Sequence, residues 1–230
     1  MKTIGILGGM SWQSTKFYYE YLNTLVAERL GGNHSSKILM SSVDFSEVER
    51  FFNKDDWAGL GHMMAEEAKK LEGAGADCLI LATNTVHLVS GAIRQATTIP
   101  FLHLTEVVGS AIQKQGLKKV ALLGTQFTME KGFYVDILKD QFNIETLIPN
   151  SEERQYLQDL IFNELVKGQF TEAAKEKCLT IIKRLQNEGA EGVVLGCTEF
   201  PILLPAKTIS MPSFDTTLLH TKAAVEFALS

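Results

Sequence analysis

Two segments of the sequence end in residues that could transfer protons. GADCLILATNTVHL spans Gly75–Leu88 and GAEGVVLGCTEFPI spans Gly189–Ile202; aligned without a gap, they place Thr83 opposite Cys197. A cysteine thiol ionises at about pH 8.5, and nearby hydrogen-bond donors lower its pKa further. A threonine hydroxyl has no accessible anion, so it can only donate or relay a proton. The pair predicts a proton-transfer site with one strong and one weak member.

These residues need strands to position them, and the sequence offers two further similar runs. KTIGILGG (Lys2–Gly9) and KKVALLGT (Lys118–Thr125) are short and apolar, and each reaches a glycine-containing end. Such runs are typical of buried parallel strands. Their offset along the chain nearly equals the offset between Thr83 and Cys197. Two similarities at one offset indicate an internal duplication.

Helical periodicity fills the intervals between these strands. The amphipathic spacing predicts a helix over Ser14–Leu30, with Ser14 as its cap, and a last helix over Thr216–Ser230. Two more helices, over Trp57–Gly75 and Glu172–Ala190, lead into the repeated segments and meet glycines near their ends. Alternating strands and helices predict an α/β fold with parallel sheets. We expect one lobe from residues 1–103 plus 212–230 and a second from residues 104–211.

In open α/β sheets, ligands bind beyond the carboxyl ends of the strands. Thr83 and Cys197 both follow such ends, so we expect them to flank one cleft between two pseudo-symmetric lobes. Two groups on opposite faces of one atom suit the inversion of a stereocentre, in which one removes a proton and the other delivers one. Neutral donors are expected to bind the substrate around them: the turn Gly8, Gly9, Met10 and Ser11, with Asn84, Thr85, Thr125, Thr128 and Thr198.

Composition narrows the classes of partner and cofactor. The formal net charge is −5 and no basic tract occurs, which argues against a nucleic-acid partner. No apolar stretch is long enough to span a membrane. Three cysteines without a CxxC pair or a secretory signal predict a cytoplasmic protein with no metal site. GILGGM lacks the G-x-G-x-x-G spacing of dinucleotide binding, so a nicotinamide cofactor is not expected.

Four motifs together resemble the aspartate/glutamate racemases that work without pyridoxal phosphate. They are IGILGGM (Ile4–Met10), NTVH (Asn84–His87), LLGTQFT (Leu122–Thr128) and GCTE (Gly196–Glu199), and they run in order along nearly the whole chain. Glu199 after GCT is similar to the aspartate-racemase branch. The resemblance implies two Rossmann-like lobes, a cleft between them, a homodimer, and no metal or organic cofactor.

The resemblance also implies a cysteine after each repeated strand, the first for the D-substrate and the second for the L-substrate. Cys197 matches the second, whereas Thr83 stands where the first is expected. Charged substrate-binding residues found in some aspartate racemases have no clear match, although Arg50 and Lys167 lie near their positions. The resemblance therefore implies a racemase of an acidic amino acid, aspartate or glutamate, and the pair Thr83 and Cys197 implies unequal proton-transfer groups.

The sequence also suggests residues that support the site, and it leaves alternative functions open. We expect His87 to hydrogen-bond Glu199 or Thr83, where it or a water could resupply a proton to Thr83, and Glu199 to support the site. Cys78 and Cys178 are expected in the core. Other enzymes of the wider superfamily, of the hydantoin racemase, malonate decarboxylase or maleate isomerase type, remain alternatives. So does a non-catalytic amino-acid-binding homologue.

Overall fold

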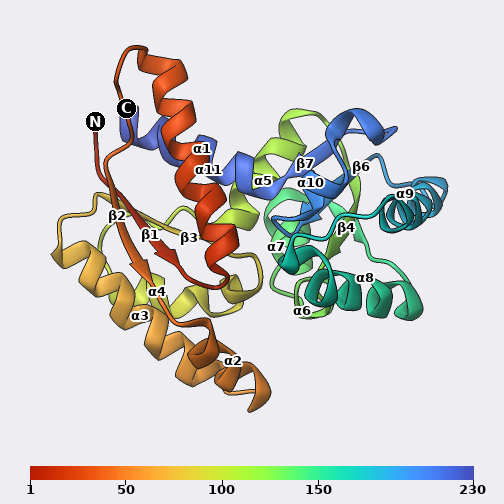
Figure 1. The fold of residues 1–230 in the computed structure, drawn as a ribbon, viewed down its shortest axis with the longest axis horizontal. Helices are drawn as coiled ribbons and strands as arrows, with labels where there is room; N and C mark the ends of the chain where they lie inside the picture. The colour runs from red at the N-terminus through yellow and green to blue at the C-terminus, as the bar shows by residue number, and fades with distance from the viewer. The chain divides into compact units, whose positions relative to one another are not determined.

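The computed structural model describes all 230 residues and divides the chain into two compact units (Figure 1). Unit 1 comprises Met1–Leu104 and Thr217–Ser230, and unit 2 comprises Thr105–Thr216. The chain returns to unit 1 at Thr217 rather than at the expected residue 212. The reason is that the strand Ser213–Asp215 pairs within the second sheet.

Unit 1 is built on a parallel sheet of three strands in the order β2-β1-β3. Its first strand is therefore central, and the register places Leu7 beside Leu81. The elements of unit 1 are β1 (Ile4–Gly8), α1 (Trp12–Leu30), β2 (Ile38–Ser42), α2 (Phe45–Asn53), α3 (Trp57–Gly73), β3 (Cys78–Leu81), the 3-10 turn η1 (Thr85–Val89), α4 (Ser90–Ala96) and α11 (Thr216–Leu229).

Helices cover both faces of this sheet, which explains why its strands are apolar throughout. Leu7, Leu79 and Leu81 point to one face and pack with residues of α3 and α4. The alternate residues Ile6 and Ile80 point to the other face and pack with α1 and α11 (Figure 1). The period of two in strand side chains thus divides one strand between two cores.

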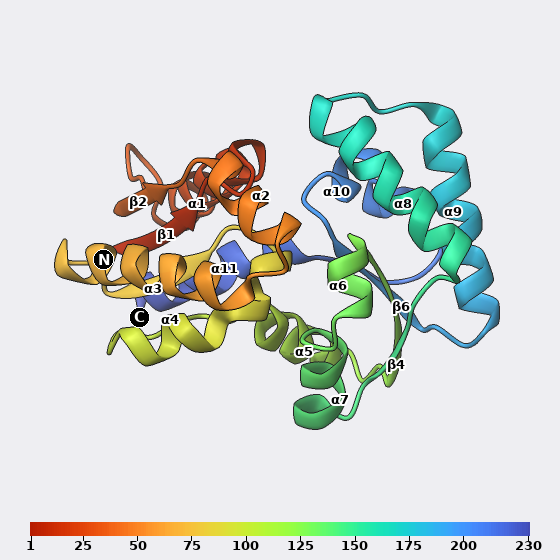
Figure 2. The same cartoon turned by 90° about the horizontal axis from the view of Figure 1, so that it is seen from below.

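Unit 2 contains a second parallel sheet, in the order β5-β4-β6-β7. Figure 2 shows α8 and α9 running side by side next to β4 and β6. The elements of unit 2 are α5 (Leu104–Lys114), β4 (Lys119–Gly124), α6 (Gln126–Glu130), α7 (Val135–Phe142), β5 (Glu145–Leu147), α8 (Ser151–Asn163), η2 (Leu165–Lys167), α9 (Glu172–Asn187), β6 (Gly192–Gly196), α10 (Phe200–Leu203), η3 (Ala206–Thr208) and β7 (Ser213–Asp215).

The two units repeat one topology, as the internal similarity predicts. In each, the first strand is flanked by the second and the third, so β1 corresponds to β4 and β3 to β6. The acids of the two repeated Gly-Ala-acid triplets also make equivalent hydrogen bonds. Asp77 accepts a hydrogen bond from the Thr3 amide at 2.6 Å, and Glu191 accepts one from the Lys118 amide at 2.6 Å. Each acid therefore anchors the start of the neighbouring first strand.

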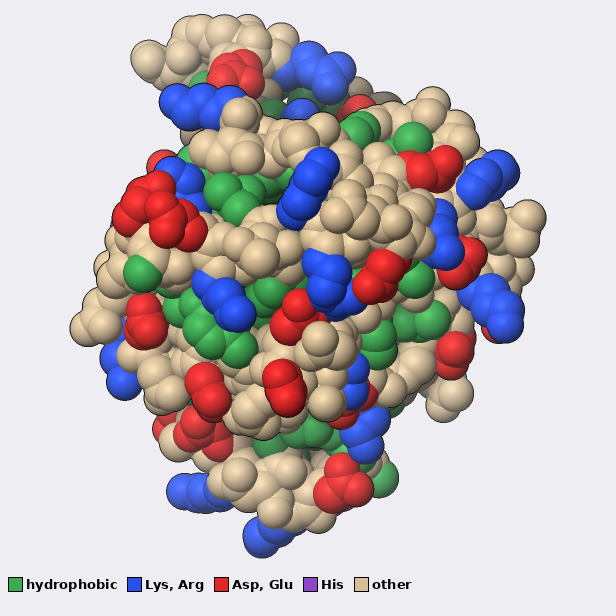
Figure 3. Space-filling model, turned by 90° about the vertical axis from the view of Figure 1, so that its right-hand side faces the viewer, with side chains coloured by type: hydrophobic (Ala, Val, Ile, Leu, Met, Phe, Trp, Pro, Cys, Tyr) green, Lys and Arg blue, Asp and Glu red, His purple; other side chains and the backbone are tan.

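The surface and the helix lengths agree with this layered fold. No helix is both long and apolar enough to cross a membrane. On the face drawn in Figure 3, Lys and Arg side chains are interspersed with Asp and Glu side chains. That face presents no continuous basic surface of the kind that binds nucleic acid.

Candidate active site

Strand register brings the expected site residues together within each unit. In unit 1, Leu7 pairs with Leu81, so the turn after β1 and the segment after β3 leave the sheet at the same edge. In unit 2, Gly124 pairs with Gly196, so the segments after β4 and β6 also leave side by side. Each unit therefore gathers two of the four motifs at the carboxyl end of its sheet.

Thr83 lies just beyond β3 with a hydroxyl that the protein leaves unbonded. Its amide donates to the Leu81 carbonyl at 2.8 Å, and its own carbonyl accepts a bond from His87. Its side-chain oxygen makes no hydrogen bond, although the residue is only 8% exposed. The fold thus fixes the Thr83 backbone and leaves the hydroxyl available to another group.

His87 holds this backbone rather than the hydroxyl. Its Nδ1 lies 2.7 Å from the Thr83 carbonyl oxygen, and its Nε2 accepts the Leu104 amide at 3.2 Å. Because the carbonyl can only accept, the Nδ1 carries the proton. Both ring nitrogens are therefore occupied by backbone groups. The expected hydrogen bond to Thr83 is present, but the expected proton relay to its hydroxyl was wrong for this geometry.

Two more buried histidines surround His87. His103 lies with its ring centroid 4.8 Å from that of His87, and His220 bonds Tyr18 and the Leu102 carbonyl through its two nitrogens. Burial lowers the pKa of His103 to about 3 and of His220 to about 4, and it lowers the pKa of His87 well below its usual value. The cluster is therefore neutral at physiological pH.

Cys197 follows the last residue of β6 and is paired with a carboxylate. Its Sγ donates to Glu199 Oε2 at 2.9 Å, and the Thr198 hydroxyl donates to the same oxygen at 2.7 Å. Glu199 is 4% exposed, and its Oε1 has no hydrogen-bond partner. Cys197 itself is only half-buried. A partly accessible thiol thus adjoins a buried proton acceptor.

This carboxylate changes the acid–base character expected of the thiol. Burial, and then the negative charge of Glu199, raise the pKa of Cys197 well above its usual value. The sequence predicts donors that lower this pKa. The backbone amides of Glu199 and Thr198 do lower it, but burial and the carboxylate of Glu199 outweigh them. In this structure the resting thiol is therefore protonated.

The segment after β4 presents Thr125 but encloses Thr128. Thr125 caps α6, with its hydroxyl accepting the Thr128 amide at 3.2 Å. The Thr128 side chain is fully buried and packs over Gly124 and Gly196, where a Cβ at either position would approach it closely. Thr125 is half-buried and better placed for a ligand. Thr128 acts as a packing residue beneath it.

The turn after β1 is also more internally bonded than the sequence indicates. The Gly9 amide donates to the Thr15 hydroxyl at 2.9 Å, and Met10 is buried. Ser11, not Ser14, caps α1, because its side chain accepts the Ser14 amide. Thr15 was missed: its spacing from Ser11 signals the bond from its hydroxyl to the Ser11 carbonyl at 3.0 Å, but not the bond that it accepts from Gly9. These amides support the turn rather than stand open.

The remaining candidate residues lie after the strand ends, and the other two cysteines lie in the core. Asn84 and Thr198 are buried beside Thr83 and Cys197, respectively, and Thr85 is half-buried at the start of η1. Cys78 and Cys178 are buried core residues whose pKa is raised to about 12 by desolvation. No three His, Cys, Asp or Glu side chains are grouped so that they could hold a metal ion.

Comparison with known proteins identifies the class to which this fold and these strand ends belong. The family model described as Asp/Glu/hydantoin racemase matches residues 7–224. The chain belongs to this family of isomerases. This match confirms the resemblance drawn from the four motifs of the sequence.

Relatives with similar sequences span the whole chain. A structure from Yersinia pestis, provisionally assigned as an Asp/Glu racemase, is 40% identical with a TM-score of 0.95, and each chain covers 100% of the other. An aspartate racemase homologue from Pyrococcus horikoshii is 35% identical with a TM-score of 0.90, again over 100% of both chains. The broad specificity amino-acid racemase RacX of Bacillus subtilis is 25% identical over 99% of this chain and 98% of its own.

Proposed function

We propose that this chain racemises an acidic amino acid, aspartate or glutamate, by proton transfer at the α-carbon without an organic cofactor. Cys197 is the thiol acid/base on the face of the L-substrate, and Thr83 is its counterpart on the opposite face. The observation that carries the proposal is the thiol directly after β6, hydrogen-bonded to the buried Glu199 at 2.9 Å. The named racemases among its relatives support the same class of reaction.

The contact between Cys197 and Glu199 supplies a route to the thiolate. A protonated thiol cannot remove an α-proton, so it must first lose its own. Transfer of this proton to Glu199 gives a thiolate beside a neutral carboxylic acid, and the total charge of the pair does not change. No additional charge has to be buried. The thiolate then takes the α-proton of the L-substrate and becomes a thiol again, and the proton held by Glu199 passes to solvent water, which restores the carboxylate.

On the opposite face of the substrate the proton-transfer group is Thr83, which is a weaker acid and base catalyst than Cys197. The unbonded Thr83 hydroxyl can donate its proton to the carbanion, after which water must restore it, because both nitrogens of His87 are occupied. As a base, the hydroxyl is poorly matched to neutral pH. The enzyme should therefore remove the α-proton of the L-substrate faster than that of the D-substrate.

Neutral groups would hold the substrate and the negative charge that develops on it. We assign direct contact to Asn84, Thr85, Thr125 and Thr198, because each follows a strand end next to one of the two catalytic residues. Gly9, Met10, Ser11 and Thr128 are assigned to shaping and supporting this site, since their polar or bulky groups are engaged within the fold. Donors fixed in advance stabilise an enolate-like intermediate without reorganising.

A single screen tests this function. The purified protein is incubated in deuterated water with L- and D-aspartate, L- and D-glutamate, a neutral amino acid and a substituted hydantoin, and loss of the α-proton signal is followed by NMR. We expect exchange with aspartate or glutamate that survives dialysis against chelators and carbonyl-trapping reagents, and that is lost in Cys197→Ala. Exchange confined to the hydantoin, or absent from every compound, would refute the proposal.

We also propose a cytoplasmic homodimer, which rests on the family. Sedimentation over micromolar concentrations should give twice the mass of the 25.5 kDa chain. A monomer throughout this range would refute the dimer and leave the catalytic proposal intact.

A further inference from the structure

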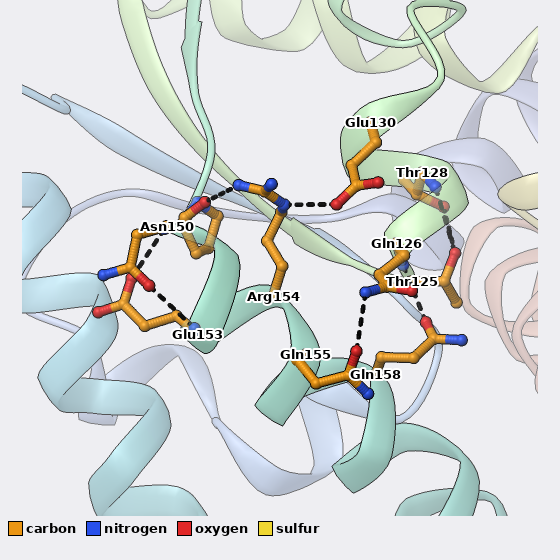
Figure 4. Close-up of polar contacts among 10 residues, drawn as sticks. Thr125, Gln126, Thr128, Glu130, Asn150, Glu153, Arg154, Gln155 and Gln158 are labelled. Carbon is orange, nitrogen blue, oxygen red and sulfur yellow. Dashed lines mark hydrogen bonds and ion pairs between the residues drawn. The ribbon is translucent and has the colours of Figure 1, made fainter.

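Thr125 caps the start of the short helix α6. Side chains of α8 form hydrogen bonds with both ends of α6 (Figure 4). At the beginning of α6, Gln158 Oε1 accepts the Gln126 amide at 2.9 Å. At its end, Arg154 Nε donates to Glu130 Oε1 at 2.6 Å. The close-up shows these side chains reaching from one face of α8 toward α6, as their spacing along that helix allows.

The contact from Gln158 satisfies a backbone group that α6 cannot satisfy itself. The first amides of a helix have no acceptor within it. Thr125 supplies an acceptor for the Thr128 amide, whereas the Gln126 amide depends on Gln158. Gln155 adds a bond to the Gln126 side chain at 3.1 Å, but that bond involves no backbone group. Gln158 is thus the side chain of α8 that satisfies a backbone amide in the first turn of α6.

The helix that provides Gln158 is itself firmly held. Asn150 and Glu153 form a capping box at the start of α8. Glu153 is also ion-paired with Arg184 of α9, and Arg154 donates to the Pro149 carbonyl at 2.6 Å. A restrained α8 can transmit its position to the backbone at the start of α6 through the hydrogen bond from the Gln126 amide to Gln158.

The position of α6 matters because its residues adjoin the proposed site. Gln126 directly follows Thr125, and Thr128 packs over Gly196, the residue before Cys197. The two strands beneath are secured by their ladder, since β4 pairs with β6 over several residues and β6 also pairs with β7. The first turn of α6 has no such ladder. A shift there would move Thr125 more than Cys197.

We propose that Gln158 is a positioning residue for substrate binding, acting through the Gln126 amide on Thr125. This inference rests on the proposed function for its link to catalysis. It assigns to α8, which carries none of the family motifs, a part in setting affinity for the substrate. Arg154 restrains the end of α6 and Gln155 restrains the side chain of Gln126, but neither replaces the acceptor for the Gln126 amide.

The test compares Gln158→Leu, which removes the acceptor, with Gln158→Glu, which keeps an acceptor oxygen at the same reach. Gln155→Leu is the matched control, because it loses a hydrogen bond from the same helix without exposing a backbone amide. Steady-state exchange of the L-substrate should show KM raised about tenfold in Gln158→Leu with kcat changed by less than about threefold. Gln158→Glu and Gln155→Leu should stay within about twofold of the parent.

Hydrogen exchange gives a second readout that does not need turnover. Peptides covering residues 125–130 should exchange faster in Gln158→Leu than in Gln155→Leu. Should Gln158→Leu fail to fold, Gln158→Asn serves, because its shorter side chain withdraws the acceptor and stays polar. A parent-like KM with parent-like exchange in a folded acceptor-deficient variant would overturn the proposal, and so would an equal defect in Gln158→Glu.

Turnover and hydrogen exchange together distinguish a failure of the proposed function from a failure of the positioning role of Gln158. If the parent protein exchanges no α-proton of any acidic amino acid, the proposed function fails, and the hydrogen-exchange comparison alone decides whether Gln158 fixes α6. If the parent turns over but all three variants match it in KM, the proposed function stands and the positioning role is overturned.

Discussion

His87 donates its Nδ1 proton to the carbonyl oxygen of Thr83 at 2.7 Å and so ties the imidazole to the backbone of the residue that ends the first repeat. The other nitrogen accepts the Leu104 amide, which leaves the ring with no free position. His87 therefore holds Thr83 in place and does not carry its protons.

Replacement of His87 distinguishes holding from relaying. His87→Asn keeps a donor near the Thr83 carbonyl, whereas His87→Leu leaves that carbonyl and the Leu104 amide unpaired and should cost about 2–5 kcal/mol of unfolding free energy. We expect His87→Asn to retain most α-proton exchange from both enantiomers. Chemical denaturation and exchange by NMR measure the two effects. Loss of D-side exchange alone in a stable His87→Asn would instead identify a proton relay.

The unequal pair predicts unequal rates from the two enantiomers. Exchange from the L-substrate should exceed exchange from the D-substrate, because only Cys197 offers a thiol base. Thr83→Cys should add the second thiol and raise D-side exchange most, by at least about tenfold. The equilibrium ratio stays unchanged, because a catalyst alters both directions together. A folded Thr83→Cys with parental D-side exchange would contradict the pairing of these residues.

Glu199→Gln should separate the reactivity of the thiol from turnover. Without the negative charge of Glu199, the pKa of Cys197 falls toward its usual value. Each pKa unit of this decrease gives about tenfold more thiolate at neutral pH. Alkylation of Cys197 by iodoacetamide, followed by mass spectrometry, should therefore accelerate. Exchange of the α-proton, measured in parallel, falls if turnover requires Glu199 to accept the thiol proton and rises if the resting thiolate suffices. Thr198→Val keeps the carboxylate and serves as the control for the alkylation rate. Slower alkylation in Glu199→Gln would refute this account.

The buried histidines predict a loss of stability in mild acid. Their folded-state pKa values lie below the unfolded value of about 6.5, reaching about 3 for His103 and about 4 for His220. Below pH 6.5 these histidines bind protons in the unfolded chain but not in the folded chain. The free energy of unfolding therefore falls as the pH falls toward 4. Each histidine contributes at most about 1.4 kcal/mol per pH unit. Urea titrations from pH 7.5 to 5 check this. A flat profile that does not change in His220→Gln would contradict it.

Gly196 should be intolerant of even one methyl group. An added Cβ would lie 2.8 Å from the Leu123 carbonyl oxygen and 3.3 Å from Thr128 Cγ2. Gly196→Ala should therefore lower the unfolding free energy by about 1–3 kcal/mol and reduce exchange as well. Gly91→Ala, where nothing lies within 4 Å, is the matched control and should be neutral or stabilising. Equal stabilities of the two variants would be the opposing result.

The strands β1, β3, β4 and β6 were predictable because each is a short apolar run that ends in glycine or small polar residues, whereas β2, β5 and β7 were not predicted. KTIGILGG contains β1 and KKVALLGT contains β4, and the helices before β3 and β6 begin at the predicted Trp57 and Glu172. The bonds of His87 were not predictable, because a sequence does not show which backbone groups a buried ring will meet. Gln158 likewise carries no local signal, since its partner Gln126 lies in another helix.

The hydrogen bond from Cys197 to Glu199 also bears on how the protein ages in an oxidising environment. Peroxides attack thiolates, and a thiol kept protonated is slow to form sulfenic acid. In the resting protein the raised pKa of Cys197 therefore protects the one cysteine that is not enclosed by the core. Under the proposed mechanism, Cys197 is most easily oxidised during turnover, when the thiol has given its proton away. Oxidative damage should then accumulate with the number of catalytic cycles rather than with time.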